Sequence, residues 1–115
     1  MDTLAGREPA SPLPPDPQDT RLVIVVYDQA IEVNLLDCLD ELELPHFTRW
    51  AGAQGSGRQG RREGTPVWPG LNNVLLMAIP PEMVRPLVER LYALRAEFPQ
   101  TPALRILVSG PIQLY

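Results

Sequence analysis

Residues 50–70 read WAGAQGSGRQGRREGTPVWPG, and the fold of the whole chain has to accommodate this stretch. It shows no apolar periodicity and is rich in glycine, so we expect neither a helix nor the interior of a packed strand. Connections beyond about 12–15 residues are uncommon inside compact domains, and those that occur mostly bind ligands or lack fixed structure. The stretch is therefore predicted to be a long loop with a function. Its glycines are Gly52, Gly55, Gly57, Gly60, Gly64 and Gly70.

Arginine side chains lie among these glycines. Arg58, Arg61 and Arg62 bring guanidinium groups close to backbone N–H groups that no side chain shields, an arrangement suited to an anion. A solvated loop surface explains the same arginines equally well. Trp68 is a candidate cover for a ligand, although a tryptophan beside a Pro-Gly turn more often packs on the base of its own loop.

The composition excludes several classes of protein. A length of 115 residues fits a single domain, and a formal net charge of -4 argues against a general nucleic-acid binder. All ten basic residues are arginine, so a Schiff-base lysine and a P-loop lysine are both excluded. Cys38 is the only cysteine, which excludes an intrachain disulfide and a cysteine-rich zinc site.

The beginning of the chain differs from the rest. It has no apolar core of a signal peptide, and no run in the sequence approaches the ~20 apolar residues of a membrane span, so we expect a cytoplasmic protein without membrane insertion. Residues 1–20 are rich in proline and poor in large apolar side chains, and are predicted to form a disordered tail. Residues 21–115 then form the folded domain. A proline-rich ligand for a partner domain also fits the tail, with weaker support because P-x-x-P matches are frequent.

The first half of the domain predicts a strand, a helix and a strand. Residues 22–27, LVIVVY, form a β-branched apolar run typical of a strand buried on both faces. Asp28 is a suitable N-cap for a helix that ends at Pro45, and residues 46–51 alternate as a second strand that enters the loop. The helix has apolar residues at helical spacing, namely Ile31, Leu35, Cys38, Leu39 and Leu42, and we expect Glu32, Asp37, Asp40, Glu41 and Glu43 on its solvated face.

The second half repeats this order. Residues 73–79 predict a third strand, and Asn72 and Asn73 at its start are expected either to satisfy local backbone groups or to bind a base edge. The next helix contains Pro86, which predicts a late start or a bend. Residues 104–108 predict the last strand, and residues 112–115 a short added one. The apolar residues of this helix are Val84, Leu87, Val88, Leu91, Leu94 and Phe98.

The order of elements is β-α-β-β-α-β, which is the ferredoxin-like arrangement of the α+β class, with the long glycine-rich connection between strands two and three. Two helices cover only one face of a four-stranded antiparallel sheet. The strands are nevertheless apolar on both faces, and so much exposed apolar surface is unusual for a monomer. We therefore expect another subunit to cover the second face, in a closed cyclic assembly. The third strand illustrates the pattern with Val74, Leu76 and Ala78 on one side and Leu75, Met77 and Ile79 on the other.

Residues 55–60, GSGRQG, follow a strand after the first helix and resemble the G-x-G-R-Q-x-G start of the T-loop in PII-type signal-transduction proteins, the nitrogen-regulatory family. The order of predicted elements matches that family as well. The resemblance implies a homotrimer that binds adenine nucleotides in clefts between subunits and uses its T-loop to contact a membrane transporter or an enzyme. It also implies that Gly55, Gly57 and Arg58 lie at the base of the T-loop beside the cleft, and that Gln59 helps to hold a 2-oxo acid.

The chain departs from the family pattern in two places. PII proteins carry a glycine-rich loop with Asp and Lys before the last strand, which grips the nucleotide phosphates, whereas residues 98–103 read FPQTPA. The modified tyrosine of the T-loop is also missing, because residues 50–70 contain no Tyr. The resemblance therefore implies a divergent PII-like protein and weakens the expectation of tight ATP binding with 2-oxoglutarate. Some PII-like groups bind other nucleotides, bicarbonate-linked ligands or metals, and the related CutA proteins share the trimeric fold.

Functions of different classes remain open at this point. The first is a trimeric sensor that binds a nucleotide or small anion between subunits and presents its loop to a partner. The alternative is a CutA-like or PII-like metal-binding homeostasis protein that gathers Cys38 or His46 around a symmetry axis. A third is an interaction module without a ligand. No catalytic constellation emerges, so we expect no enzyme activity, and an adenine nucleotide as effector rather than cofactor. The candidate effector-binding residues are Gly55, Gly57, Arg58, Gln59, Gly60, Arg61, Arg62 and Trp68.

Overall fold

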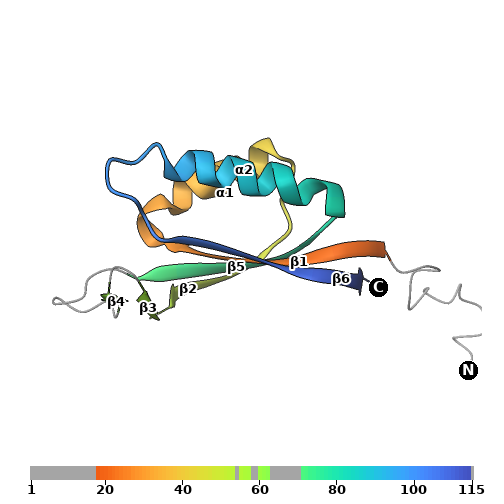
Figure 1. Ribbon diagram of the computed structural model, residues 1–115, viewed down its shortest axis with the longest axis horizontal. Helices are drawn as coiled ribbons and strands as arrows, with labels where there is room; N and C mark the ends of the chain where they lie inside the picture. The colour runs from red at the N-terminus through yellow and green to blue at the C-terminus, as the bar shows by residue number, and fades with distance from the viewer. Residues whose placement is uncertain (1–17, 54, 58–59, 63–70, 115) are drawn as a thin grey trace, which may run out of the picture.

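The computed structural model describes residues 18–53, 55–57, 60–62 and 71–114. Two helices lie on one face of a four-stranded antiparallel sheet with strand order β2-β5-β1-β6, so the α+β ferredoxin-like prediction is confirmed (Figure 1). The sheet strands are β1 (Gln18–Asp28), β2 (Thr48–Ala53), β5 (Asn72–Ile79) and β6 (Leu104–Leu114), and the helices are α1 (Glu32–Glu41) and α2 (Val84–Arg95).

Strand β1 begins at Gln18, three residues before the expected start of the domain at residue 21. These added residues pair with the end of β6, with Gln18 opposite Leu114 and Thr20 opposite Ile112. The side chain of Thr20 is buried, which the prolines around it in the sequence did not indicate. Residues 1–17 of the predicted tail lie outside the described residues.

Local sequence signals account for where the helices begin. Asp28 accepts a hydrogen bond from the backbone N–H of Ala30 at 2.8 Å and so caps a short 3-10 turn, Gln29–Ile31, that leads into α1. A second 3-10 turn, Pro81–Met83, precedes α2. Pro86 falls in the first turn of α2, where its missing N–H would have no intrahelical partner in any case. The helix therefore starts late, as predicted, and contains the proline at little cost.

The last strand is one continuous element rather than a strand and a short addition. Arg21 lies opposite Pro111 and Val23 opposite Val108, so β6 carries one extra residue at this point and forms a bulge. The hydroxyl of Ser109 accepts a hydrogen bond from the backbone N–H of Leu22 at 3.1 Å. That contact satisfies an amide beside the irregular pairing.

The core fills the space between the helices and one face of the sheet. All side chains in it are apolar apart from the hydroxyl of Tyr27 and the thiol of Cys38, which is fully buried. The predicted apolar stripes of both helices point into this layer. Its members are Val23, Val25, Tyr27, Ile31, Leu35, Cys38, Leu39, Leu75, Met77, Ile79, Leu87, Leu91, Leu94 and Leu104.

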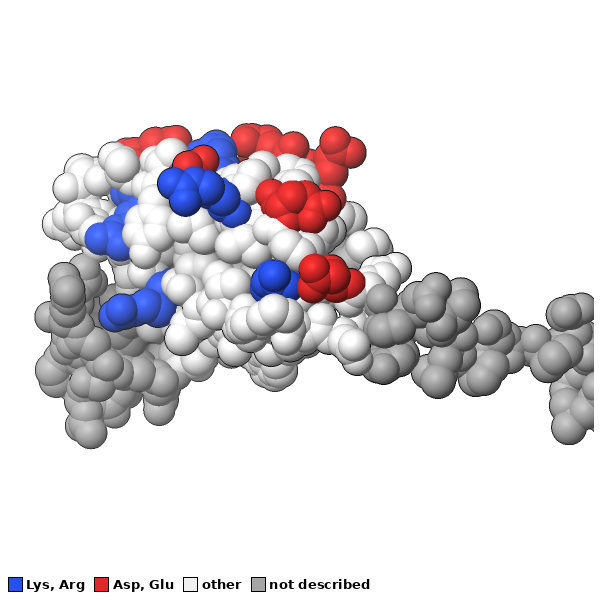
Figure 2. All heavy atoms as spheres, turned by 45° about the vertical axis from the view of Figure 1, so that its right-hand side comes forward, with Lys and Arg blue, Asp and Glu red and all other residues white. Residues whose placement is uncertain are grey.

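The other face of the sheet is also apolar, which confirms the two-faced pattern expected from the sequence. Directly paired residues of antiparallel strands lie on the same face, so the register gives one row across the sheet, Thr48, Leu76, Ile24 and Leu107. Leu107 is 50% exposed, and Trp50, two residue pairs further along β2 and so on the same face, is 52% exposed. We call this surface the open face. Charged side chains gather instead over the helix layer, and the sheet side of the view is largely uncharged (Figure 2).

The glycine-rich stretch contains more regular structure than a plain loop. Strand β3 (Gly55–Gly57) pairs antiparallel with β4 (Gly60–Arg62), with Gly55 opposite Arg62 and Gly57 opposite Gly60. The prediction of a loop was therefore wrong for residues 55–57 and 60–62, because glycine disfavours the packed interior of a strand and a two-stranded ribbon outside the main sheet does not require packed side chains. This hairpin follows β2 beyond the end of the sheet (Figure 1). In the part of the chain that the structure describes, no helix is long and apolar enough to cross a membrane.

Candidate functional site

The candidate site is the junction at which β2 leaves the sheet and enters the glycine hairpin. Trp50 lies opposite Val74 and Ala53 opposite Asn72, so two residues of β2 face one residue of β5. This is a β-bulge, a device that bends a strand and increases its twist. Gly52 occupies the bulge with φ +73°, in the left-handed region that favours glycine. The backbone thus fixes the direction in which the chain continues.

Asn73 of β5 completes the bulge with its side chain. Its Oδ1 accepts a hydrogen bond from the backbone N–H of Gly52 at 2.9 Å, and from Gln29 Nε2 at a longer 3.5 Å. Asn73 is 2% exposed, so this contact lies in a region from which water is excluded. Of the two roles expected for this asparagine, the described contacts support the local one, because its oxygen serves the backbone beside it.

We expect Gly52→Ala to lower the free energy of unfolding by roughly 1–2 kcal/mol, the cost of a left-handed conformation for a residue with a Cβ. Space is not the reason, since the added Cβ would meet Leu71 Cδ1 at 3.6 Å, an ordinary contact. Gly110→Ala is the control, because its Cβ would meet no atom within 4 Å. Urea denaturation measures both variants, and equal losses at the two positions would contradict the role of the bulge.

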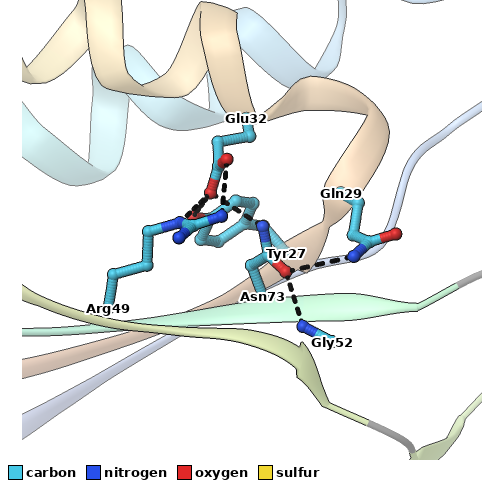
Figure 3. A network of polar contacts seen from close by, with 6 residues as sticks. All are labelled: Tyr27, Gln29, Glu32, Arg49, Gly52 and Asn73. Atoms are coloured by element: carbon cyan, nitrogen blue, oxygen red, sulfur yellow. Dashed lines mark hydrogen bonds and ion pairs between the residues drawn. The ribbon is translucent and has the colours of Figure 1, made fainter.

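A charged network joins this junction to the start of α1 (Figure 3). The Glu32 carboxylate accepts hydrogen bonds from Tyr27 Oη at 2.8 Å, from Asn73 Nδ2 at 2.7 Å and from both Nε and Nη2 of Arg49, the latter at 2.9 Å. The donors come from β1, β5 and β2. One carboxylate therefore ties three neighbouring strands to the first turn of α1, where an acidic group is also favoured by the helix dipole.

The ionisation of the network follows from these contacts. Hydrogen bonds from Arg49 hold the pKa of Glu32 below its usual value, and those from Tyr27 and Asn73 act in the same direction. Burial raises the pKa of Tyr27 to about 12, with a further contribution from the neighbouring carboxylate. At neutral pH the network therefore holds an ionised glutamate and a neutral phenol. Both forms match the hydrogen bonds that the structure contains.

Sequence reasoning missed this network. Glu32 was expected on the solvated face of α1 and is instead turned toward the sheet, so that expectation was wrong for this residue. A signal was present, because Glu32 precedes the buried Leu35 by three positions and Leu39 by seven, which places all three on one side of the helix. Asp37, Asp40, Glu41 and Glu43 are exposed, as expected.

The residues predicted to bind an effector lie next to the junction in the chain. Of these residues, the structure pairs Gly55 with Arg62 and Gly57 with Gly60, and it places Arg61 opposite Ser56, all within one hairpin. Arg58, Gln59 and Trp68 lie outside the described residues.

A neighbouring amide offers an acceptor at the same place. Asn72 Oδ1 is buried and has no hydrogen-bond partner among the described residues, although it stands at the start of β5 where the long connection returns to the sheet. A buried amide oxygen without a donor is costly, so it favours the approach of an N–H or O–H group.

The metal alternative gains no support from the described residues. They include no group of three His, Cys, Asp or Glu side chains close enough to hold an ion. Cys38 lies fully inside the core, and burial raises the pKa of its thiol, which disfavours the thiolate that a metal requires. His46 is exposed on the segment before β2.

The described elements thus define a protein of the α+β class with a ferredoxin-like sheet and a long connection, begun by a glycine hairpin, between two adjacent strands. No protein-family model matches the sequence, and no curated protein matches it significantly. Comparison with solved structures does find similar proteins. Solved structures that share the fold include PII-like proteins, and the chain has the PII-like fold in a divergent form.

Three solved structures illustrate the likeness. CPII, a nitrogen regulatory PII-like protein from Thiomonas intermedia K12, bound to ADP, AMP and bicarbonate, gives a TM-score of 0.69 at 20% identity over 85% of this chain and 90% of that chain. Its apo form gives 0.61 at 19% identity, over 85% and 94%. A protein from Thermus thermophilus described as a PII-like signaling protein gives 0.62 at 20% identity, over 86% and 92%.

Proposed function

We propose that this chain is a divergent PII-like regulator that binds an adenine nucleotide, together with a small anion such as bicarbonate, and presents its 50–70 segment to a partner protein. The observation that carries the proposal is the position of the GSGRQG sequence. It follows directly on β2 at the bulged junction, in a chain whose fold resembles CPII bound to ADP, AMP and bicarbonate. The partner is a membrane transporter or an enzyme, and the chain itself acts as a cytoplasmic sensor and not as an enzyme.

The open face supports a homotrimer. Leu76 and Ile24 lie side by side in the register, and Leu107 extends the row to the edge strand. Contiguous exposed apolar surface of this kind marks a contact with another protein, and closed cyclic assemblies are the usual solution for identical chains. Packing of copies through this face brings the β2 junction of each copy close to a subunit boundary, where a shared nucleotide site would form.

The arginines suit an anionic effector. Arg58, Arg61 and Arg62 lie within five residues of one another in the sequence, beside glycines whose N–H groups are unshielded. Arg49 and Asn73 already donate hydrogen bonds to Glu32, so the proposed anion site consists of the arginines of the glycine-rich segment and not of these two residues. Binding would fix the segment in one conformation that a partner recognises, which is an order–disorder switch.

Calorimetry with ADP, ATP, AMP and cyclic AMP, each with and without bicarbonate and 2-oxoglutarate, tests the proposal. We expect heat with ADP or AMP, increased by bicarbonate. No heat with any of these compounds would refute the proposed function. A metal-dependent rise in melting temperature that disappears in His46→Ala would favour the metal-binding alternative instead.

Replacing Arg58 with Ala is expected to weaken effector binding by about 1.5–3 kcal/mol, the strength of a charge-assisted hydrogen bond. Arg85→Ala is the matched control. Arg85 is exposed at the end of α2 away from the hairpin and pairs only with Glu89 among the contacts described (Figure 1). Equal affinities of the Arg58 and Arg85 variants would place the anion site elsewhere, and sedimentation should find the same assembly for both.

A further inference from the structure

The Glu32 carboxylate has more donors than a surface ion pair needs. Four hydrogen-bond donor atoms reach it, from Tyr27, Asn73 and Arg49, and its side chain is only 21% exposed. Glu41, at the other end of α1, is 56% exposed and has Arg90 as its one ion-pair partner among the described residues, with hydrogen bonds of 2.9 and 3.4 Å. Exposed pairs of the second kind contribute little to stability. The two ends of the same helix thus offer a matched comparison.

The contacts form a continuous path from α1 to the bulge. Glu32 accepts from Asn73 Nδ2, and the oxygen of the same amide accepts from the N–H of Gly52. Because one planar amide makes both contacts, the carboxylate fixes the rotation of the Asn73 side chain and thereby the acceptor of Gly52. Arg49 adds a second connection three residues earlier in β2. Both routes end in β2, one at Gly52 and the other at Arg49 (Figure 3).

We propose that Glu32 is a positioning residue for the effector site: it fixes the bulge at Gly52 and so sets the direction in which β2 leaves the sheet toward the paired strands β3 and β4. The ligand in this inference rests on the proposed function. The contacts from Glu32 through Asn73 to Gly52, which we call the anchor, rest on the described structure. Glu32 itself does not touch the effector. Its effect on affinity is conformational, since a hairpin held in the binding orientation loses less entropy on binding.

A second effect of the same residue would act in the opposite direction. Glu32 neutralises Arg49, so removing its charge leaves a cation near the proposed anion site and attracts an anion more strongly. The two effects are separable because they predict opposite changes in affinity for Glu32→Gln. Positioning predicts that Glu32→Gln and Arg49→Gln both weaken binding. Electrostatics alone predicts that the first strengthens binding and the second weakens it.

The experiment compares wild type, Glu32→Gln, Arg49→Gln and the control Glu41→Gln. Calorimetry measures affinity for ADP with bicarbonate, and hydrogen exchange followed by NMR measures the amide of Gly52. We expect both network variants to bind roughly five- to tenfold more weakly. We expect their Gly52 amide to exchange about tenfold faster than in wild type. Glu41→Gln should match wild type in both measurements.

Each other outcome is decisive. Tighter binding by Glu32→Gln would assign the residue an electrostatic role and overturn the positioning role. Unchanged Gly52 exchange in Glu32→Gln would overturn the anchor itself, whatever the affinity. If wild type binds none of the nucleotides while Gly52 exchange still rises in Glu32→Gln, the proposed function fails and the anchor stands.

Discussion

Leu76→Glu is expected to convert the proposed trimer into folded monomers, whereas Met77→Glu is expected to unfold the chain. The two residues are neighbours in β5 and point to opposite faces of the sheet. Leu76 lies on the open face between Ile24 and Thr48. Met77 is 3% exposed beneath the helices. The two variants thus introduce the same carboxylate at neighbouring positions of β5, one on the open face and one in the core.

The energies differ because the environments differ. A carboxylate at residue 77 would enter a core without a partner, at a cost of several kcal/mol, against a total stability of about 5–15 kcal/mol for a typical domain. At residue 76 the carboxylate remains in water in the monomer, so we expect the monomer to lose about 1 kcal/mol or less. The introduced carboxylates of different subunits would be buried and repel one another only when the open faces pack together.

Analytical ultracentrifugation and circular dichroism distinguish these results. Wild type should sediment as a trimer, Leu76→Glu as a monomer with wild-type secondary structure, and Met77→Glu as unfolded or aggregated chain. A monomeric wild type at micromolar concentration would contradict the covered open face and the shared effector site with it. A Leu76→Glu variant that still sediments as a trimer would move the subunit contact to another surface.

Asn73→Ala is expected to lower the free energy of unfolding by about 2–4 kcal/mol, because it removes the acceptor of one part-buried N–H group and one hydrogen bond to a charged carboxylate. The N–H of Gly52 would lose its acceptor and the Glu32 carboxylate one of its donors. The amide is 2% exposed, so water does not readily replace these bonds.

Asn34→Ala provides the control for this substitution. Asn34 is exposed on α1, and a surface replacement of this kind typically changes stability by about 0.5 kcal/mol or less. Urea denaturation of both variants gives the difference. A loss in Asn73→Ala no larger than in Asn34→Ala would show that the network adds nothing to stability, and would weaken its use as an anchor.

The sequence predicted the elements of this fold because their signals are local. The apolar run at residues 22–27 and the periodic apolar residues of both helices depend only on neighbours along the chain. The turn before α1 is similar, since Asp28 caps it from two residues away. The boundaries of β1 and β6 were harder to predict from the sequence, because Gln18 and Leu114 join their strands by pairing with each other across 96 residues of sequence.

The candidate site was predictable only in part, for the same reason. The glycine and arginine residues of the 55–62 segment were identified from composition and motif. The network beside them was not, because Glu32, Arg49 and Asn73 lie on three elements that only the sheet register brings together. Glu32 is a polar residue on the buried face of α1, and its partners depend on which strands lie beneath that face.

The strand order has a consequence for how the chain is made. Strand β1, the first described element, occupies an interior position and pairs with β5 on one side and β6 on the other, so its edges are paired only after β5 and then β6 have left the ribosome. Such distant pairing slows folding, and an unpaired apolar strand is prone to join other chains. A nascent chain of this protein therefore depends on the eleven-residue strand β6 to protect one edge of β1.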